Sequence, residues 1–382
     1  MFKFIHTSDW HIGRLFQNIS LLDDQLFVLE QIKQYALEHQ VDALVIAGDI
    51  FDRSIPPVDA VDALDQFVGS FISDTHIPIV MISGNHDSAT RIRFGASLAS
   101  GAGFHMIASL NRCMEPVVIH GKRGSAAFYG IPFHEPVEVR EAFGEDTKTY
   151  DEAHTFLVES IKQQLNHEQP NILISHCFVA GAQASDSERK LSVGGSESVS
   201  YEPMLDFDYV ALGHLHGPQY RGAQHVRYSG SPLKYSFSES GHNKSVTLVE
   251  VGEGGATHTQ LPLHAKRDLR ILTGSLDELL TQAANDPNKD DFILARLTDE
   301  QDLLDPMRRL RDHYPNIVEM ERINYIKHSG SQLVADVGKM RSEMDIFEDF
   351  FTQVTGSELT PEQSELIASV IQQANKSLEE RS

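Results

Sequence analysis

Five short clusters of Asp, His and Asn residues are spread along the first part of the chain. In chain order they are Asp9-Trp10-His11, Gly48-Asp49-Ile50-Phe51-Asp52, Gly84-Asn85-His86-Asp87, the single His176, and Gly213-His214-Leu215-His216. Carboxylate, imidazole and amide groups are good ligands for divalent first-row metals. None of the clusters contains Cys, which argues against a structural zinc site made of thiolates. The clusters therefore predict a metal site built from oxygen and nitrogen ligands.

Each cluster taken singly has a simpler interpretation. Asp-x-His and Gly-Asp-x-x-Asp also occur in ordinary loops and turns, and a solitary His such as His176 is more often a hydrogen-bonded structural residue. His214 and His216 are spaced as two residues on one face of a strand. Trp10, the sole tryptophan, fits a packing role beside the site. The five clusters nevertheless each follow a predicted strand, and coincidence is a poor account of that arrangement.

The elements that position the clusters are short apolar runs rich in Val, Ile or Phe, which are typical of buried strands. The runs are residues 2–5, 43–47, 77–82, 171–174 and 209–212. Two amphipathic helices are predicted between the first three runs, with apolar stripes Leu22, Leu26, Leu29 and Ile32, and, after Pro57, Val61, Leu64, Val68 and Phe71. This alternation predicts a layered α/β domain with some parallel strands. Ligands bind beyond the carboxyl ends of such strands, so we expect the clusters to meet at one site.

The pattern divides the chain into three predicted parts: residues 1–264, a small α+β unit at 265–335, and C-terminal helices at 336–382. Residues 181–200 are rich in Gly, Ser and charge, which predicts an exposed loop, and residues 328–331 predict a joint. In the tail, Thr360-Pro361-Glu362-Gln363 has the pattern of a capping box. Two helices this short bury little against each other, so their apolar faces are expected to dock on another surface. These faces carry Phe347, Phe350, Phe351, Leu366 and Ile367.

Composition narrows the classes of function. The chain has 382 residues and a formal net charge of −23, which excludes a generic basic protein that coats DNA. Two cysteines, Cys113 and Cys177, cannot form a disulfide framework and favour a reducing compartment. No stretch has the pattern of a signal peptide or of a membrane span. We therefore expect a soluble, cytoplasmic protein.

The ordered clusters resemble the signature of the calcineurin-like metallophosphoesterases. The resemblance implies a layered α-β-β-α domain that binds two divalent metal ions. It implies that one metal is held by Asp9, His11, Asp49 and His216 and the other by Asp49, Asn85, His176 and His214, with Asp49 bridging them. A carboxylate suits that position because it can offer one oxygen to each ion, and a metal pair can stabilise both the attacking and the leaving oxygen of a phosphoryl displacement.

By the same resemblance His86 is the general acid that protonates the leaving sugar oxygen, a task that suits a group titrating near neutral pH. The alternative for His86 is a positioning role behind the metal ligands. Asp52 departs from the pattern, since many nuclease relatives have a His at this place. It is therefore predicted to orient His86 or a water molecule.

Flanking residues resemble those of the DNA nucleases within this family. They are His6-Thr7-Ser8, Ala47, Ser192-Val193-Gly194-Gly195-Ser196-Glu197 and Tyr228-Ser229-Gly230-Ser231-Pro232. This resemblance implies a manganese-dependent 3′→5′ exonuclease on duplex ends and an endonuclease on hairpins and single strands, used in DNA replication, recombination and repair. It further implies a capping, DNA-binding role for residues 265–335, a homodimer formed through helices near 57–72 and 91–100, and a partner, an ABC-type ATPase with a long coiled coil, held by the tail helices. Core packing is an equally good explanation for the apolar positions of the helices at 57–72 and 91–100.

The net negative charge of the chain has to be reconciled with a DNA substrate, because the affinity of a protein for duplex DNA comes largely from basic side chains that neutralise phosphates. The metals add about +4 at the site, and basic residues are present at Arg53, Arg91, Arg93, Arg189, Lys190, Lys266, Arg267, Arg308, Arg309 and Arg311. We expect weak, salt-sensitive DNA binding by this chain alone. Two other functions remain open: a phosphomonoesterase or cyclic-nucleotide phosphodiesterase, and a binding module without catalysis.

Overall fold

The computed structural model describes residues 1–188 and 197–323 and a few C-terminal positions (344, 347, 348, 351, 359, 360, 363, 364, 366–368, 370 and 371). The chain divides into two compact units, residues 1–296 with 305–320, and residues 297–304 with 321–382. The first unit contains all five clusters.

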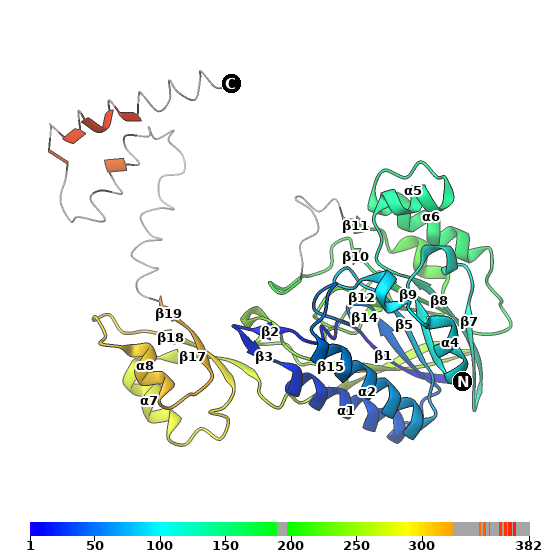
Figure 1. Ribbon diagram of the computed structural model, residues 1–382, viewed down its shortest axis with the longest axis horizontal. Coiled ribbons are helices and arrows are strands. Elements are labelled where there is room, and N and C mark those ends of the chain that lie inside the picture. The colour runs from blue at the N-terminus through cyan, green and yellow to red at the C-terminus, as the bar shows by residue number, and fades with distance from the viewer. Residues whose placement is uncertain are drawn as a thin grey trace. The chain divides into compact units, whose positions relative to one another are not determined.

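Two six-stranded sheets form the centre of the first unit (Figure 1). The first has the order β16 (Gly255–Pro262), β15 (Ser245–Gly252), β1 (Phe2–Thr7), β4 (Ala43–Ala47), β5 (Ile79–Ile82), β6 (Phe104–Ile107). Strands β1, β4, β5 and β6 are parallel, whereas β15 pairs antiparallel with β1. The second has the order β13 (Gln219–Arg221), β14 (Ala223–Tyr228), β12 (Tyr209–Gly213), β9 (Asn171–His176), β8 (Gly124–Ile131), β7 (Val117–Gly121). All five predicted strand runs are present.

Three apolar cores hold the layers together, and each core corresponds to one interface. Between the two sheets, Phe4, Val45, Phe128, Ile172 and Tyr209 are fully buried in one cluster. The outer face of the first sheet packs on α1 (Leu22–Glu38) and α2 (Val58–Thr75), and that of the second on α5 (Pro136–Phe143) and α6 (Tyr150–Lys162). Full burial of each large apolar side chain contributes about 1.5–3 kcal/mol. The predicted α-β-β-α class is confirmed.

The predicted helical stripes are correct except at two positions. In α1 the buried side includes Val28, Leu29 and Ile32, while Leu26 is exposed. The buried Gln25 occupies the inner face of the helix where Leu26 was predicted. In α2 the buried side includes Val68 and Phe71, while Val61 is exposed near the start of the helix. Periodicity alone could not exclude Leu26 and Val61, because an apolar side chain costs little when it faces water.

A three-stranded sheet follows the sandwich, with the order β17 (Leu269–Gly274), β18 (Phe292–Leu297), β19 (Ile317–Arg322). Helices α7 (Leu276–Ala283) and α8 (Pro306–Arg311) accompany it, so this part of the chain combines strands and helices, as predicted for an α+β unit. Within the first unit, Leu269 and Phe292 pack against Val28 of α1. Arg267 is ion-paired with the buried Asp24 of α1. The predicted domain limits at 264 and 335 stay predictions.

Little of the C-terminal part is described. The predicted joint at 328–331 and most of the tail lie outside the described residues. The capping box is present: the Thr360 N–H donates to Gln363 Oε1 over 2.9 Å, and the Gln363 N–H donates to Thr360 Oγ1 over 3.4 Å. Among the helices that the structure describes, none is both long and apolar enough to cross a membrane.

Candidate metal centre

The five clusters lie together, at the carboxyl ends of five parallel-running strands. The first three follow β1, β4 and β5, which are neighbours in one sheet, and the last two are at the ends of β9 and β12, which are neighbours in the other. The sheets approach closely here, and His176 Nδ1–H donates to the carbonyl oxygen of Ala47 over 2.9 Å. The structure thus brings together all seven predicted metal ligands.

One group of ligands is formed by Asp9, His11 and His216, whose ligand atoms lie within 4.8 Å of one another. The Nε2 atoms of His11 and His216 are 3.1 Å apart. Two imidazole nitrogens that face each other across this distance point toward the same position, which is the arrangement expected of two ligands of one metal ion.

A second group surrounds Asn85. Its Oδ1 atom lies 2.9 Å from His176 Nε2 and 3.1 Å from His214 Nδ1. These three side chains come from the ends of β5, β9 and β12. The carbonyl oxygen and two imidazole nitrogens converge in the same way as the atoms of the first group.

Asp49 lies between the two groups. Its Oδ2 atom is 3.7 Å from His11 Nε2 and 3.5 Å from His176 Nε2, and its Oδ1 atom accepts the His86 backbone N–H over 2.8 Å. Asp9, Asp49 and His176 also form a ligand group of their own. A single oxygen of Asp49 thus lies within 3.7 Å of a histidine from each group, which is the position expected of a shared ligand.

Burial sets the protonation of these groups. It raises the pKa of the Asp9 carboxyl to about 6, and neighbouring imidazoles offset part of that rise. Burial lowers the pKa of His11 well below its usual range and that of His214 to about 3, so both imidazoles are neutral at pH 7. For His176, burial alone lowers the pKa, but Asp49 more than offsets it and the pKa is raised to about 9. A bound cation would stabilise the Asp9 anion and would use the neutral imidazoles as ligands.

The residues present fit a divalent metal pair. Two buried atoms at the centre, His11 Nδ1 and Asn85 Nδ2, have no hydrogen-bond partner among the described residues. The donor set of carboxylate, imidazole and amide groups is the one that Mn²⁺, Fe²⁺ and Zn²⁺ accept. The centre also holds strained backbone: Asp9, His11, Asp49 and His214 have φ values of 54°, 47°, 50° and 105°. Such conformations cost about 1–3 kcal/mol each and are retained mainly at functional sites.

His86 is oriented by the main chain of Asp52. Its Nδ1 atom donates to the Asp52 carbonyl oxygen over 2.7 Å, which leaves Nε2 as the atom available to a substrate. The Asp52 carboxylate instead binds Arg14 over 2.9 Å and lies 3.8 Å from His11 Nδ1. His11, Asp52 and His86 form a further group that could hold a metal ion. Asp52 is thus placed to orient His86 through its carbonyl group, while its carboxylate is held by Arg14.

Two polar residues that support the loops, the buried Gln25 and the partly buried Asp87, were not predicted. The Gln25 amide of α1 donates to the carbonyl oxygens of Trp10 and His11, over 3.0 and 2.7 Å. The Asp87 carboxylate accepts the backbone N–H groups of Ile50, Phe51 and Gly84 over 2.9–3.1 Å. Asp87 was part of a recognised cluster, but nothing in its spacing indicated that it joins two loops. Trp10 packs edge-on against Phe67 of α2, so it has the packing role.

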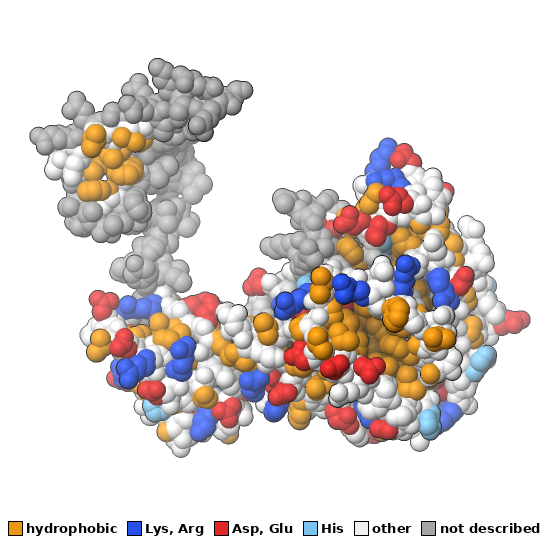
Figure 2. Space-filling model, viewed as in Figure 1, with side chains coloured by type: hydrophobic (Ala, Val, Ile, Leu, Met, Phe, Trp, Pro, Cys, Tyr) orange, Lys and Arg blue, Asp and Glu red, His pale blue; other side chains and the backbone are white. Residues whose placement is uncertain are grey.

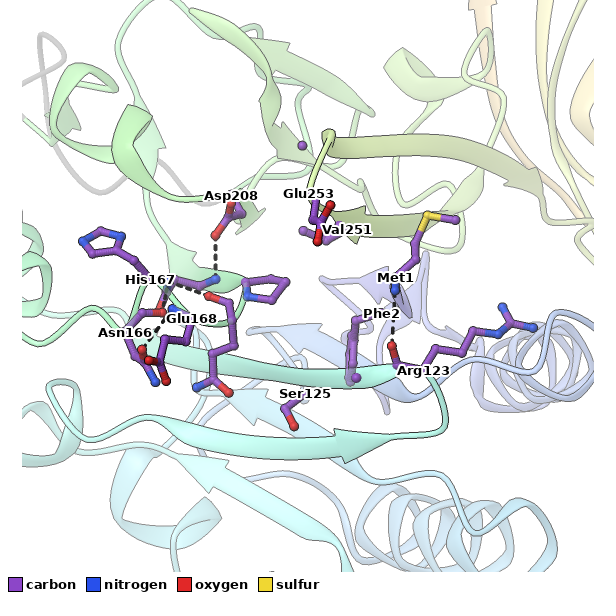
Figure 3. Close-up of a pocket in the computed structure, with 16 residues that line it drawn as sticks. Met1, Phe2, Arg123, Ser125, Asn166, His167, Glu168, Asp208, Val251 and Glu253 are labelled. Carbon is purple, nitrogen blue, oxygen red and sulfur yellow. Dashed lines mark hydrogen bonds between the residues drawn. The ribbon is translucent and has the colours of Figure 1, made fainter.

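A separate cavity of about 540 Å³ lies at the opposite edge of the sheets, at the start of β1 and β9 (Figure 3). It is lined by residues including Met1, Arg123, His167, Asp208 and Glu253. None of the candidate ligands lines it, so this cavity is not part of the metal centre.

Comparison with known families identifies the class. The profile of the calcineurin-like phosphoesterases matches residues 2–218, which is more than half of the chain. The chain belongs to the calcineurin-like phosphoesterase family, whose members are metal-dependent hydrolases. A second profile, described as the type 5 capsule protein repressor C-terminal domain (SbcD_C), matches residues 265–355. The two matches together fit a nuclease subunit of the SbcD type.

Two solved structures to which this chain is similar share little sequence with it. One is the protein TT1561 of Thermus thermophilus, with 14% identity over 68% of this chain and 98% of that chain and a TM-score of 0.39. Another is a dimetal phosphatase from Danio rerio, with 11% identity over 69% of this chain and 99% of that chain and a TM-score of 0.37.

Proposed function

We propose that the protein is a manganese-dependent DNA nuclease that acts with an SbcC-type ABC ATPase in the processing of DNA ends and hairpins. The observation that carries the proposal is the sharing of Asp49 between two ligand groups, in a chain that also matches the SbcD_C profile. A phosphoesterase of small molecules has no evident need for the second domain.

The ligands divide between two metals as the geometry suggests. Asp9, His11 and His216 would hold one metal and Asn85, His176 and His214 would hold the other, with Asp49 available to both. Bound divalent metals stabilise charge on phosphoryl oxygens and lower the pKa of a coordinated water. Around them, Asp49 Oδ1 holds the backbone of His86, and the Asp52 carbonyl oxygen holds its ring. In its imidazolium form His86 carries a second proton on Nε2, and it gives that proton to the leaving sugar oxygen while Nδ1–H stays bound to Asp52.

Basic side chains that lie close to the ligand clusters in sequence favour a nucleic acid substrate. Arg53, Arg91 and Arg93 are exposed; Arg53 directly follows the second cluster, and Arg91 and Arg93 lie within six residues of the end of the third. Arg267 and Arg309 are paired with Asp24 and Asp277, so these two offer less net charge to phosphates. The first three cations thus lie close to the metal ligands along the chain, and the chain as a whole stays acidic.

The test compares cleavage of a DNA hairpin and a linear duplex in Mn²⁺, with and without the ATPase partner and ATP. Wild type is expected to cut both DNAs, while Asp49→Asn, which keeps the shape of the side chain but lacks the shared negative charge, is expected to cut neither. p-Nitrophenyl phosphate and a cyclic nucleotide are assayed in parallel. Hydrolysis of these small esters with no cleavage of DNA in any arm would overturn the proposal in favour of a small-molecule phosphoesterase.

The tail is proposed to bind the ATPase. Leu366, which belongs to the predicted apolar faces, and Val370, four residues further along the chain, are exposed. Two short amphipathic helices with exposed apolar residues suit a groove on a partner.

A homodimer is proposed to form through α2 and the short helices α3 (Ala89–Ile92) and α4 (Ala96–Ala99). Phe94, Leu98 and Val58 are 90%, 84% and 77% exposed, and Ile55 and Val61 are exposed beside them in sequence. Figure 2 shows hydrophobic side chains gathered on the face where α2 and α4 lie, with Lys and Arg along one border. A contiguous apolar area on a surface otherwise rich in charge marks an interaction site.

Substitution of Phe94→Glu together with Leu98→Glu is expected to convert the dimer to a monomer, because two carboxylates would be buried without partners. Sedimentation velocity measures the change, and circular dichroism checks that the fold is retained. As a control, Leu15→Glu changes an exposed apolar residue outside this area. A double variant that sediments as wild type does would exclude this surface.

A further inference from the structure

A buried ion pair lies directly behind the metal ligand His216. Lys244 Nζ and Glu239 Oε2 are 2.6 Å apart, and their side chains are 5% and 0% exposed. Lys244 uses its other two protons on Ser231 Oγ and on the carbonyl oxygen of His216, each over 2.8 Å. A buried pair of this kind is seldom more stable than apolar residues of the same size. The buried pair of Lys244 and Glu239 is therefore expected to have a role other than stabilising the fold.

The second oxygen of Glu239 reaches the ring of His216 through a serine. Ser187 Oγ lies 2.5 Å from Glu239 Oε1 and 2.5 Å from His216 Nδ1. A serine hydroxyl has one proton, and an ionised carboxylate can only accept. The proton of Ser187 therefore goes to Glu239, and its oxygen accepts from Nδ1–H of His216. Because Nδ1 carries the proton in this series of hydrogen bonds, Nε2 of His216 is unprotonated, and it faces His11 Nε2.

The same surroundings hold the backbone of His216. Its N–H donates to Glu188 Oε1 over 2.8 Å, and its carbonyl oxygen accepts from Lys244. Ser187 and Glu188 are adjacent in the loop at 181–188, so one loop binds both the ring and the main chain of the ligand. That loop has an independent anchor, since the Asp186 N–H donates to Ser238 Oγ over 3.0 Å without touching His216.

We propose that Glu239, acting through Ser187, holds His216 as the Nδ1–H tautomer and thereby sets the affinity of the metal position formed by Asp9, His11 and His216. Ser187, Glu239 and Lys244 are positioning residues, and Lys244 keeps Glu239 ionised so that it accepts. The inference rests on the proposed two-metal function. Apolar replacements at these positions could fill the space but could not fix a tautomer. Groups that orient a metal-binding His in this way typically contribute about 10–100-fold in metal affinity.

Calorimetric titration of the metal-free full-length chain with Mn²⁺ is the first test. Wild type is expected to bind two ions, and Ser187→Ala is expected to bind one of them about 10–100-fold more weakly while the other is unchanged. Ser187→Thr keeps the hydroxyl and is expected to restore the affinity. Ser238→Ala removes the loop anchor that does not touch His216, and it is expected to bind both ions as wild type does.

The outcomes separate the two hypotheses. Wild type that binds no Mn²⁺ would overturn the proposed function, whereas Ser187→Ala that binds both ions as tightly as wild type would overturn only this inference. Equal weakening in Ser187→Ala and Ser238→Ala would also overturn it, because the loop would then act only as a tether.

A second measurement uses the wild-type chain itself and needs no folded variant at Ser187. With ¹⁵N-histidine labelling, NMR of the metal-free protein at pH 7.5 distinguishes the two neutral tautomers of each ring. The His216 signals are identified by their loss in His216→Gln. The Nδ1–H tautomer is expected, and an Nε2–H tautomer would contradict the proposal.

Discussion

Replacing His86 by Ala is expected to slow cleavage of a DNA phosphodiester by about 10²–10⁴-fold, the usual contribution of a general acid. The sugar alkoxide is a poor leaving group, and His86 Nε2 is the side-chain atom that the Asp52 carbonyl oxygen leaves available to protonate it. Mn²⁺ binding is expected to stay intact, because His86 is not among the seven candidate ligands.

The leaving group provides the sharper test. Bis(p-nitrophenyl) phosphate releases a phenolate that needs no proton, so His86→Ala is expected to hydrolyse this ester at close to the wild-type rate. The rate constants for the two substrates are compared at saturating Mn²⁺. His167→Ala, an exposed histidine at the distant cavity, is the matched control. Equal loss of activity on both esters would show that His86 acts on the metals or the fold rather than on the leaving oxygen.

Gly213→Ala is expected to destabilise the protein by about 3 kcal/mol, the upper end of the cost of overpacking. A Cβ atom at this position would lie 1.8 Å from the carbonyl oxygen of Ala47 and 2.9 Å from His176 Nδ1. The first of these atoms is backbone in the opposite sheet, so the clash is relieved only if the sheets separate. Because Gly213 precedes His214, the same movement displaces ligands of the second metal.

Urea unfolding followed by circular dichroism measures the loss of stability in Gly213→Ala, and Mn²⁺ titration measures its affinity for the metal. The matched control is Gly69→Ala in α2, where an added Cβ meets no atom within 4 Å. This control is expected to be more stable than wild type by about 0.5–1 kcal/mol, because Ala favours a helix over Gly. Similar unfolding midpoints for Gly213→Ala and wild type would contradict the close approach of the two sheets.

Several features were not predictable from local pattern. Strands β15 and β16 come late in the sequence, yet β15 pairs with β1, and Phe4 lies opposite Val249. The stripe of α1 predicted Leu26 on the inner face, where the structure has Gln25. Asp52 was predicted to orient His86 or a water. The atom of Asp52 that contacts His86 is the backbone carbonyl oxygen, which every residue type has. These features depend on which distant segments pack together, and hydrophobic periodicity reports only the face that a segment buries.

The sequence by itself determined the strands that precede each cluster, the layered α/β class and the chemical nature of the ligands, because side-chain type and spacing are local properties. The tertiary structure alone decided that Asp49 lies between His11 and His176, that His86 is held by a carbonyl oxygen, and that Ser187 connects Glu239 to His216. Each of these contacts joins residues on separate loops. Their distances are fixed only when two sheets pack face to face, and no rule of spacing along the chain contains that information.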